Sequence, residues 1–236
     1  MGHWTGKEYK KLHDLLNKRR TQMALENNVE IILEKIGGIE KLEMIAEQGN
    51  AEAQTALGLL YDRGKNIPKD DTLAYKWFLK ASEQNDHTAQ YELGSIYQYG
   101  NSIVKQDYEK ALDLYLKSAN QNNANAQCAI GFMYLHGNFV NKDIDEAIKW
   151  FMKSAEQNND IAQLSLSLVY DNDDYIQKNH EESIKWLKKS VENGNKEATE
   201  RLNNLSKQNN SGCLVPILIG ISSILSLFIL LIRNWR

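Results

Sequence analysis

The sequence predicts an all-α fold: a right-handed α-solenoid of helix-turn-helix repeats followed by one transmembrane helix. Three observations support this prediction. A motif recurs every 36 or 37 residues, apolar residues fall at helical spacing within each copy, and an uncharged apolar segment lies near the C-terminus. The 236-residue chain has 42% hydrophobic and 25% charged residues, which is typical of a folded domain. Only two prolines interrupt it, which favours long helices.

The repeat is defined by an alanine that recurs with steps of 36, 37, 36 and 36 residues, at Ala53, Ala89, Ala126, Ala162 and Ala198. A fixed period of this length indicates stacked repeats. We expect units near 53–88, 89–125, 126–161 and 162–197, with a final partial helix, in a repeat domain of residues 53–205. A degenerate repeat is expected over 37–52.

Each unit is expected to contain two antiparallel helices. In the first unit, one apolar stripe contains Ala53, Leu57, Leu60 and Tyr61, and its partner stripe contains Ala74, Trp77, Phe78 and Ala81. A polar N-cap precedes each second helix, at Asp70, Asp107, Asp143 and Asn179. Asp143 with Glu146, and Asn179 with Glu182, have the spacing of a capping box.

Two sets of glycines recur in register. Gly58, Gly94 and Gly131 fall inside the first helix, and Gly64, Gly100 and Gly137 fall at its end. A glycine inside a helix costs about 1 kcal/mol relative to alanine. A phosphate-binding loop would occur once, after a strand. The recurrence therefore indicates close helix packing for the first set and left-handed C-terminal residues for the second.

These units, written A-x-A-Q-x-x-L-G-x-x-Y-x-x-G and then D-x-x-K-A-x-x-W-x-x-K-A-A-x-x-G, resemble Sel-one-like repeats, relatives of the tetratricopeptide repeat. The resemblance covers residues 53–202. It implies an α-solenoid that binds proteins and assembles complexes without catalysis or a cofactor. In the fourth unit Ser167 and Asp173 replace the two glycines, so looser packing is expected there.

Residues 1–36 lie outside the resemblance and include the basic stretch KEYKKLHDLLNKRR. We expect this segment to form a basic helix that caps the solenoid. Its cations either contact acidic lipid or a partner, or form a solvated helix face.

Analogy with tetratricopeptide grooves places a partner surface on the concave face. The positions concerned are Thr55, Leu59, Asp62, Arg63, Tyr91, Ser95, Gln98, Tyr99, Cys128, Phe132, Leu135, His136, Leu164, Leu168, Asp171 and Asn172. Six of them are the favoured contact residues for a protein or peptide, namely Arg63, Tyr91, Gln98, Tyr99, Phe132 and His136. The alternative is that apolar members such as Leu59, Phe132 and Leu168 are buried by adjacent repeats.

Two other classes of site have partial matches in the sequence. The spacing of an EF-hand loop, at its first, third and twelfth positions, is matched by Asp171, Asp173 and Glu182. The fifth ligand and the turn glycine of that loop are replaced by Tyr175 and Ile176. A calcium-responsive adaptor is thus an alternative function, and no metal is expected. A hydrolase using Cys128 or His136 is the enzymatic alternative, although hydrolase-like relatives carry paired cysteines in each repeat and this chain does not.

The charge balance disfavours nucleic acid as a partner. Residues 37–206 contain 18 basic and 26 acidic residues, a net charge of 18 − 26 = −8. The two cysteines lie far apart in the sequence, which favours a reducing compartment.

The C-terminal region contains 20 uncharged residues, 213–232, long enough as a helix to span about 30 Å of hydrocarbon. The alternative is a buried core helix, but the polar residues within it are serines rather than a polar stripe. We expect a flexible linker over 206–212, a transmembrane helix over 213–232 and a short basic tail over 233–236. With no signal pattern at the N-terminus, the solenoid is expected on the cytosolic side. The expected function is a membrane-anchored scaffold that recruits other proteins.

Overall fold

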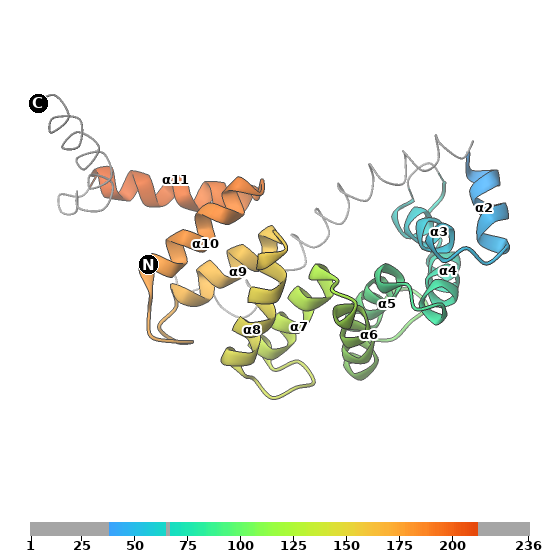
Figure 1. Cartoon of the computed structure of the whole chain (residues 1–236), viewed down its shortest axis with the longest axis horizontal. Helices are drawn as coiled ribbons and strands as arrows, with labels where there is room; N and C mark the ends of the chain where they lie inside the picture. Colours follow the sequence, from blue (N-terminus) through green and yellow to red (C-terminus); the bar gives the residue numbers. More distant parts are fainter. Residues whose placement is uncertain (1–37, 65–66, 212–236) are drawn as a thin grey trace, which may run out of the picture. The chain divides into compact units, whose positions relative to one another are not determined.

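The computed structural model describes residues 38–64 and 67–211, which form ten α-helices and no strand (Figure 1). In chain order the helices are α2 (Ile39–Glu47), α3 (Ala51–Arg63), α4 (Asp71–Glu83), α5 (His87–Tyr99), α6 (Tyr108–Asn120), α7 (Ala124–His136), α8 (Ile144–Glu156), α9 (Asp160–Tyr170), α10 (His180–Glu192) and α11 (Lys196–Ser211). The expected N-terminal capping helix, the transmembrane segment 213–232 and the basic tail 233–236 lie outside the described residues. Among the helices that are described, none is long and apolar enough to cross a bilayer.

The chain divides into two compact units, the first ending at Asn195 and the second starting at Lys196. In the first unit, α3 packs on α4, α5 on α6, α7 on α8 and α9 on α10, which gives one helix pair per repeat. The second helices α4, α6 and α8 also pack on α5, α7 and α9, so the pairs stack in chain order (Figure 1). The predicted all-α solenoid is confirmed for this unit. One pair cannot bury its apolar faces alone, and stacking buries them between neighbours.

The four predicted N-caps of the second helices are confirmed. Asp70, Asp107, Asp143 and Asn179 each accept a hydrogen bond from a backbone N–H two or three residues ahead. The first helices have polar caps as well, at Asn50, Asp86, Asn123 and Asn159. These caps were not predicted, and they place the start of each helix pair two residues before the recurring alanine.

In each of the two expected capping boxes, only one of the two hydrogen bonds forms. Asp143 Oδ1 accepts from the backbone N–H of Glu146 at 3.0 Å. The backbone N–H of Asp143, however, already donates to the carbonyl of Tyr134 at 3.0 Å. Glu146 therefore has no cap N–H to accept from, and its carboxylate pairs with Lys149 at 2.6 Å instead. The unit of Asn179 repeats this arrangement, with Tyr170, Glu182 and Lys185 in the same roles.

The helix-interior glycines permit close approach of the paired helix, as predicted. A Cβ atom at Gly58 would lie 2.6 Å from the ring of Phe78, and one at Gly94 would lie 2.7 Å from the ring of Tyr115. A Cβ atom at Gly131 would likewise lie 2.7 Å from the ring of Phe151. In the fourth unit, the hydroxyls of Ser167 and Ser183 lie 3.2 Å apart and both residues are buried.

The glycines at the helix ends differ in one unit. Gly64 and Gly137 adopt the predicted left-handed conformation, with φ/ψ of 65°/30° and 72°/35°. Gly100 also has a positive φ, 70°, but its ψ is 166°, which lies outside the left-handed helical region. The connection after Gly100 contains the extra residue of the 37-residue step. Within it, the backbone N–H of Asn101 donates a hydrogen bond to the carbonyl of Val104 at 2.9 Å.

The second compact unit contains α11. We expected a flexible linker from residue 206, but α11 continues through Ser211. Residues 206–211 contain neither glycine nor proline, so nothing in the backbone ends the helix before Gly212.

Candidate functional site

The six favoured groove residues differ in exposure. Tyr91, Gln98 and Phe132 are buried, with 4–5% of their surface exposed, whereas Arg63 and His136 are half-buried and Tyr99 is exposed. Among the other positions predicted for the groove, Asp62, Ser95, Asp171 and Asn172 are half-buried, and the buried ones are Thr55, Leu59, Cys128, Leu135, Leu164 and Leu168. The buried positions lack the exposure expected of an open groove. Partner contact by the six favoured residues stays a prediction.

The buried members pack against the second helix of their own unit. Tyr115 Oη donates to Gln98 Oε1 at 2.7 Å, and the Tyr91 ring lies 5.8 Å from the Tyr115 ring. Phe132 contacts the ring of Phe151 edge-on, with centroids 4.9 Å apart. Their side chains thus stabilise the helix pair of their own repeat, whereas the alternative stated from the sequence was burial by adjacent repeats.

The candidate calcium loop is engaged in other contacts. Asp171 Oδ1 lies 3.3 Å from Lys178 Nζ and 3.1 Å from His180 Nδ1. Glu182 pairs with Lys185 at 2.8 Å, and Asp173 accepts from the backbone N–H of Lys178 at 3.3 Å. Within residues 38–64 and 67–211, no group of three His, Cys, Asp or Glu side chains gathers as a metal site would require.

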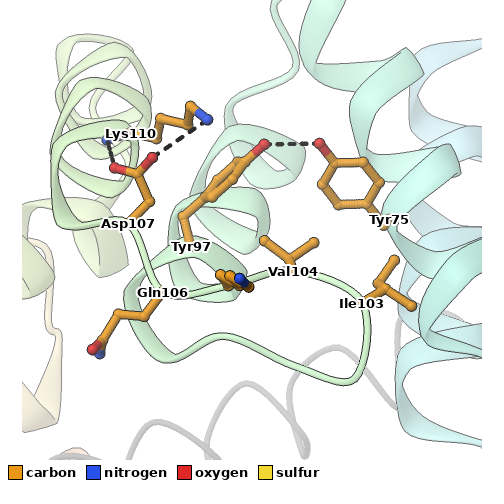
Figure 2. A pocket seen from close by; sticks show the side chains of 8 residues that line it. Tyr75, Tyr97, Ile103, Val104, Gln106, Asp107 and Lys110 are labelled. Atoms are coloured by element: carbon orange, nitrogen blue, oxygen red, sulfur yellow. Dashed lines mark hydrogen bonds and ion pairs between the residues drawn. The ribbon is translucent and has the colours of Figure 1, made fainter.

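A pocket of about 370 Å³ opens between the first and second repeats, within the compact unit that ends at Asn195 (Figure 2). Tyr75 of α4 and Tyr97 of α5 form one wall. The connection between α5 and α6, with the first turn of α6, supplies the rest of the lining: Ile103, Val104, Lys105, Gln106, Asp107 and Lys110. We call this the tyrosine-pair pocket.

The hydroxyl groups of Tyr75 and Tyr97 point toward each other within this wall of the pocket. Their hydroxyl oxygens lie 2.8 Å apart and their rings meet edge-on at 6.3 Å (Figure 2). The hydrogen bond with Tyr97, followed by burial, raises the pKa of Tyr75 to about 12. Tyr75 therefore stays neutral at physiological pH. One hydroxyl proton is used within the pair, so the other remains as a hydrogen-bond donor.

The pocket combines apolar and charged groups. Ile103 has 47% of its surface exposed, an unusual fraction for an isoleucine. Lys110 Nζ lies 3.3 Å from Asp107 Oδ2 and 5.2 Å from the centre of the Tyr97 ring, and Lys105 is exposed on the same connection. None of the eight lining residues is a histidine, cysteine or serine. The arrangement has the groups that bind an apolar and anionic segment, rather than those of a nucleophile and its base.

The connection that carries Ile103 is held to the previous repeat. Ser102 donates from both its backbone N–H and its hydroxyl to Asp71 Oδ2 at the start of α4. Asn101 Oδ1 accepts from the backbone N–H groups of Ile103 and Val104, at 3.0 and 2.8 Å. Gln106 donates to the carbonyl of Gln98 at 2.6 Å. These hydrogen bonds hold the connection in place along one side of the pocket.

Two departures from the repeat coincide at this pocket. The residues that occupy the place of Tyr75 in the other second helices are aliphatic, namely Ile39, Leu112, Ile148 and Ile184. The connection from Tyr97 to the cap Asp107 is one residue longer than its counterparts in the other units. Sequence reasoning missed the site. A position-by-position comparison of the repeats for residues that break the pattern would have found it.

Solved structures with this fold come from several bacteria. The c5321 protective antigen of uropathogenic Escherichia coli, described as displaying an SLR fold, is 36% identical over 72% of this chain with a TM-score of 0.64. This chain spans only 36% of that protein. A Sel1 repeat protein of Oxalobacter formigenes is 32% identical, with a TM-score of 0.65, and the match covers 70% of this chain and 67% of the other. The immunity protein Pa5087 of Pseudomonas aeruginosa, at 20% identity and a TM-score of 0.52, shares the fold alone.

The family comparison agrees with the helix pairs. No curated protein matches the sequence. The Sel1 repeat profile matches residues 51–86, 87–123, 124–159 and 160–195, which begin at α3, α5, α7 and α9. Four consecutive matches cover more than half of the chain, and the chain therefore belongs to the Sel1 repeat family.

Proposed function

We propose that this protein is a membrane-anchored scaffold that recruits a partner protein through the tyrosine-pair pocket. Sel1 repeats suggest protein interaction as the general role. The observation that supports this particular site is that Tyr75 and the lengthened connection, the two departures from the repeat, meet in one pocket. Neither is needed for stacking, because the other units stack with an aliphatic residue and a shorter connection.

The pocket chemistry defines the partner. Ile103 and Val104 offer an apolar surface, the tyrosine pair offers a hydrogen-bond donor, and Lys105 attracts negative charge, whereas Lys110 is paired with Asp107. Its volume suits one or two side chains. The ligand is therefore an extended segment of another protein in which an apolar residue adjoins an acidic one.

Membrane attachment is the second part of the proposal. It rests on the 20 uncharged residues 213–232, whose length matches a bilayer core. A pocket on a tethered solenoid would hold its partner at the membrane surface.

The test is a selection of displayed random peptides on the full-length protein in detergent micelles. We expect enriched peptides to pair an apolar residue with Asp or Glu. They should bind at least tenfold more weakly to Tyr75→Ile, which carries the residue of other units and should fold normally. Tyr134→Phe, at the place of Tyr97 in the third unit, is the matched control and should bind as the unaltered protein does. Peptides that bind Tyr75→Ile as well as the control, or a selection that enriches none, would refute the site.

A further inference from the structure

Phe139, in the connection between α7 and α8, combines an exposed ring with a strained backbone. Its side chain has 57% of its surface exposed, and its φ is 68°. Elsewhere in the described part of the chain, a residue other than glycine has a positive φ only at Asn85, Asn122 and Asn158. Asparagine tolerates this conformation, whereas a bulky residue with a positive φ is an outlier of the kind that gathers at functional sites.

The fold does not require an aromatic ring at this place. The next residue, Val140, packs against the core cluster that contains Tyr115 and Met133, so it already supplies the apolar contact of the connection. The left-handed residue that ends α7 is Gly137. Neither core packing nor the end of the helix therefore explains a strained and exposed phenylalanine.

Phe139 occupies the same place in its repeat as Ile103 of the tyrosine-pair pocket. Each lies four residues before the N-cap of the following helix, which is Asp143 for Phe139 and Asp107 for Ile103. Both are exposed, and the residue after each is half-buried. Because the helix pairs stack in chain order, equivalent connections of successive repeats lie along one edge of the solenoid. This edge thus presents a second exposed apolar residue, one repeat beyond the pocket.

Each of the two connections also contains an exposed lysine, Lys105 in the first and Lys142 in the second. Lys142 Nζ lies 4.9 Å from the centre of the Tyr175 ring, which belongs to the next connection. Among the described residues, no carboxylate lies within ion-pair distance of either ammonium group. We call Ile103, Lys105, Phe139 and Lys142 the connection edge. Its repeated apolar and cationic groups complement a chain that alternates apolar and acidic residues.

We propose that Phe139 is a second anchor for the partner segment that enters the tyrosine-pair pocket, an inference that rests on the proposed function and extends it. The segment follows the connection edge and places a second apolar residue against the Phe139 ring and an acidic residue near Lys142. Packed helices lie about 8–10 Å apart, and one repeat adds two of them. The two anchors are therefore roughly 9–18 Å apart, a distance that about three to six extended residues span.

The backbone strain distinguishes a binding role for Phe139 from a structural one. Phe139→Asn removes the ring and introduces the residue that the chain uses at its other left-handed positions. Because strain kept for binding lowers stability, this variant should melt at or above the temperature of the unaltered protein. A melting temperature lowered by about 4 °C or more would overturn the proposal, because the ring would then stabilise the connection itself.

The direct test is photo-cross-linking in the intact cell with the full-length protein. A photo-cross-linking amino acid replaces Phe139 in one version, Ile103 in a second, and Met152 in a third, where Met152 is exposed on α8 rather than on a connection. The Phe139 and Ile103 versions should give adducts with the same protein. Mass spectrometry should place the two attachment points within about six residues of each other. The Met152 version should give no adduct.

Variants combined with the Ile103 version show whether the two anchors hold one segment. Phe139→Asn should reduce the Ile103 adduct at least threefold, and the matched control Met152→Asn should leave it unchanged. An Ile103 adduct that is insensitive to Phe139→Asn would overturn this inference and keep the pocket. Attachment of the Phe139 version to lipid, to a second copy of this chain, to a different protein or to nothing would do the same. An Ile103 version without an adduct would refute the proposed function and, with it, this inference.

Discussion

A methyl group placed on Gly94 would lie 2.7 Å from the ring of Tyr115, closer than side-chain atoms pack. Tyr115 has 1% of its surface exposed and its hydroxyl bonds to Gln98, so its ring cannot move away without cost. This contact explains why a helix-weakening residue occupies the middle of α5, and the same contact recurs at Gly58 and Gly131.

The first prediction follows from that contact. Gly94→Ala should lower the free energy of unfolding by roughly 1–3 kcal/mol through overpacking, although alanine is the better helix former. The loss caused by Gly94→Ala should be smaller when it is measured in a Tyr115→Leu background, because the fourth unit pairs Ser167 with Leu187 at the same positions. Chemical denaturation followed by circular dichroism measures both. A Gly94→Ala protein as stable as the unaltered one would show that the glycine serves a purpose other than packing.

The second prediction concerns Glu92, at a position where the other units have Ala56, Ala129 and Ser165. Its Oε1 is enclosed and has no hydrogen-bond partner among the described residues. Burial raises the pKa of this carboxyl from 4.5 to about 7. The positive charge of Arg63 lowers this pKa and partly offsets the rise, whereas the negative charge of Asp62 adds to it.

Since the pKa is higher in the folded state, folding favours the protonated form. This contribution to stability is fully present below about pH 4.5 and is lost as the pH rises through about 7. Glu92→Gln should therefore reduce the fall in melting temperature between pH 5 and pH 8. Glu109→Gln, an exposed glutamate on α6, should keep the fall unchanged. If Glu92→Gln follows the same pH curve as the unaltered protein, the carboxyl does not titrate in this range.

The repeat architecture was predictable because stacking imposes a period on the sequence. The helix pairs, the second-helix caps and the packing role of Gly58, Gly94 and Gly131 followed from residues that recur in register. The reciprocal half of the capping box at Asp143 was not predictable, because it depends on a hydrogen bond to Tyr134, nine residues earlier.

The partner surface was harder to predict for a related reason. An analogy assigned Tyr91, Gln98 and Phe132 to an open groove, but their exposure depends on what packs over them, which no local pattern records. The tyrosine-pair pocket depends on residues that differ from their counterparts in the other repeats, such as Tyr75. A prediction based on recurring residues does not identify such positions.

The third prediction concerns the segment 213–232. The full-length protein should remain with membranes on alkaline carbonate extraction, because burial of its leucines and isoleucines outweighs the cost of the serines. Ile224→Arg, near the middle of the span, adds roughly 3 kcal/mol to the insertion cost and should shift protein to the soluble fraction. Ile103→Arg, an exposed position in the repeat domain, is the control and should leave the partition unchanged. Release of the unaltered protein by carbonate would rule out a transmembrane anchor.

The last prediction tests the central claim, that the tyrosine-pair pocket receives a partner protein. A photo-cross-linking amino acid replaces Ile103 in the full-length protein, and in a second version it replaces Leu79, which is exposed on α4 and does not line the pocket. After illumination in the intact cell, the Ile103 version should give a discrete adduct with one protein, identified by mass spectrometry, and the Leu79 version should not. Tyr75→Ile should reduce the adduct at least fivefold, and Tyr134→Phe should leave it unchanged. An adduct of equal yield from Leu79, or one insensitive to Tyr75→Ile, would contradict the account.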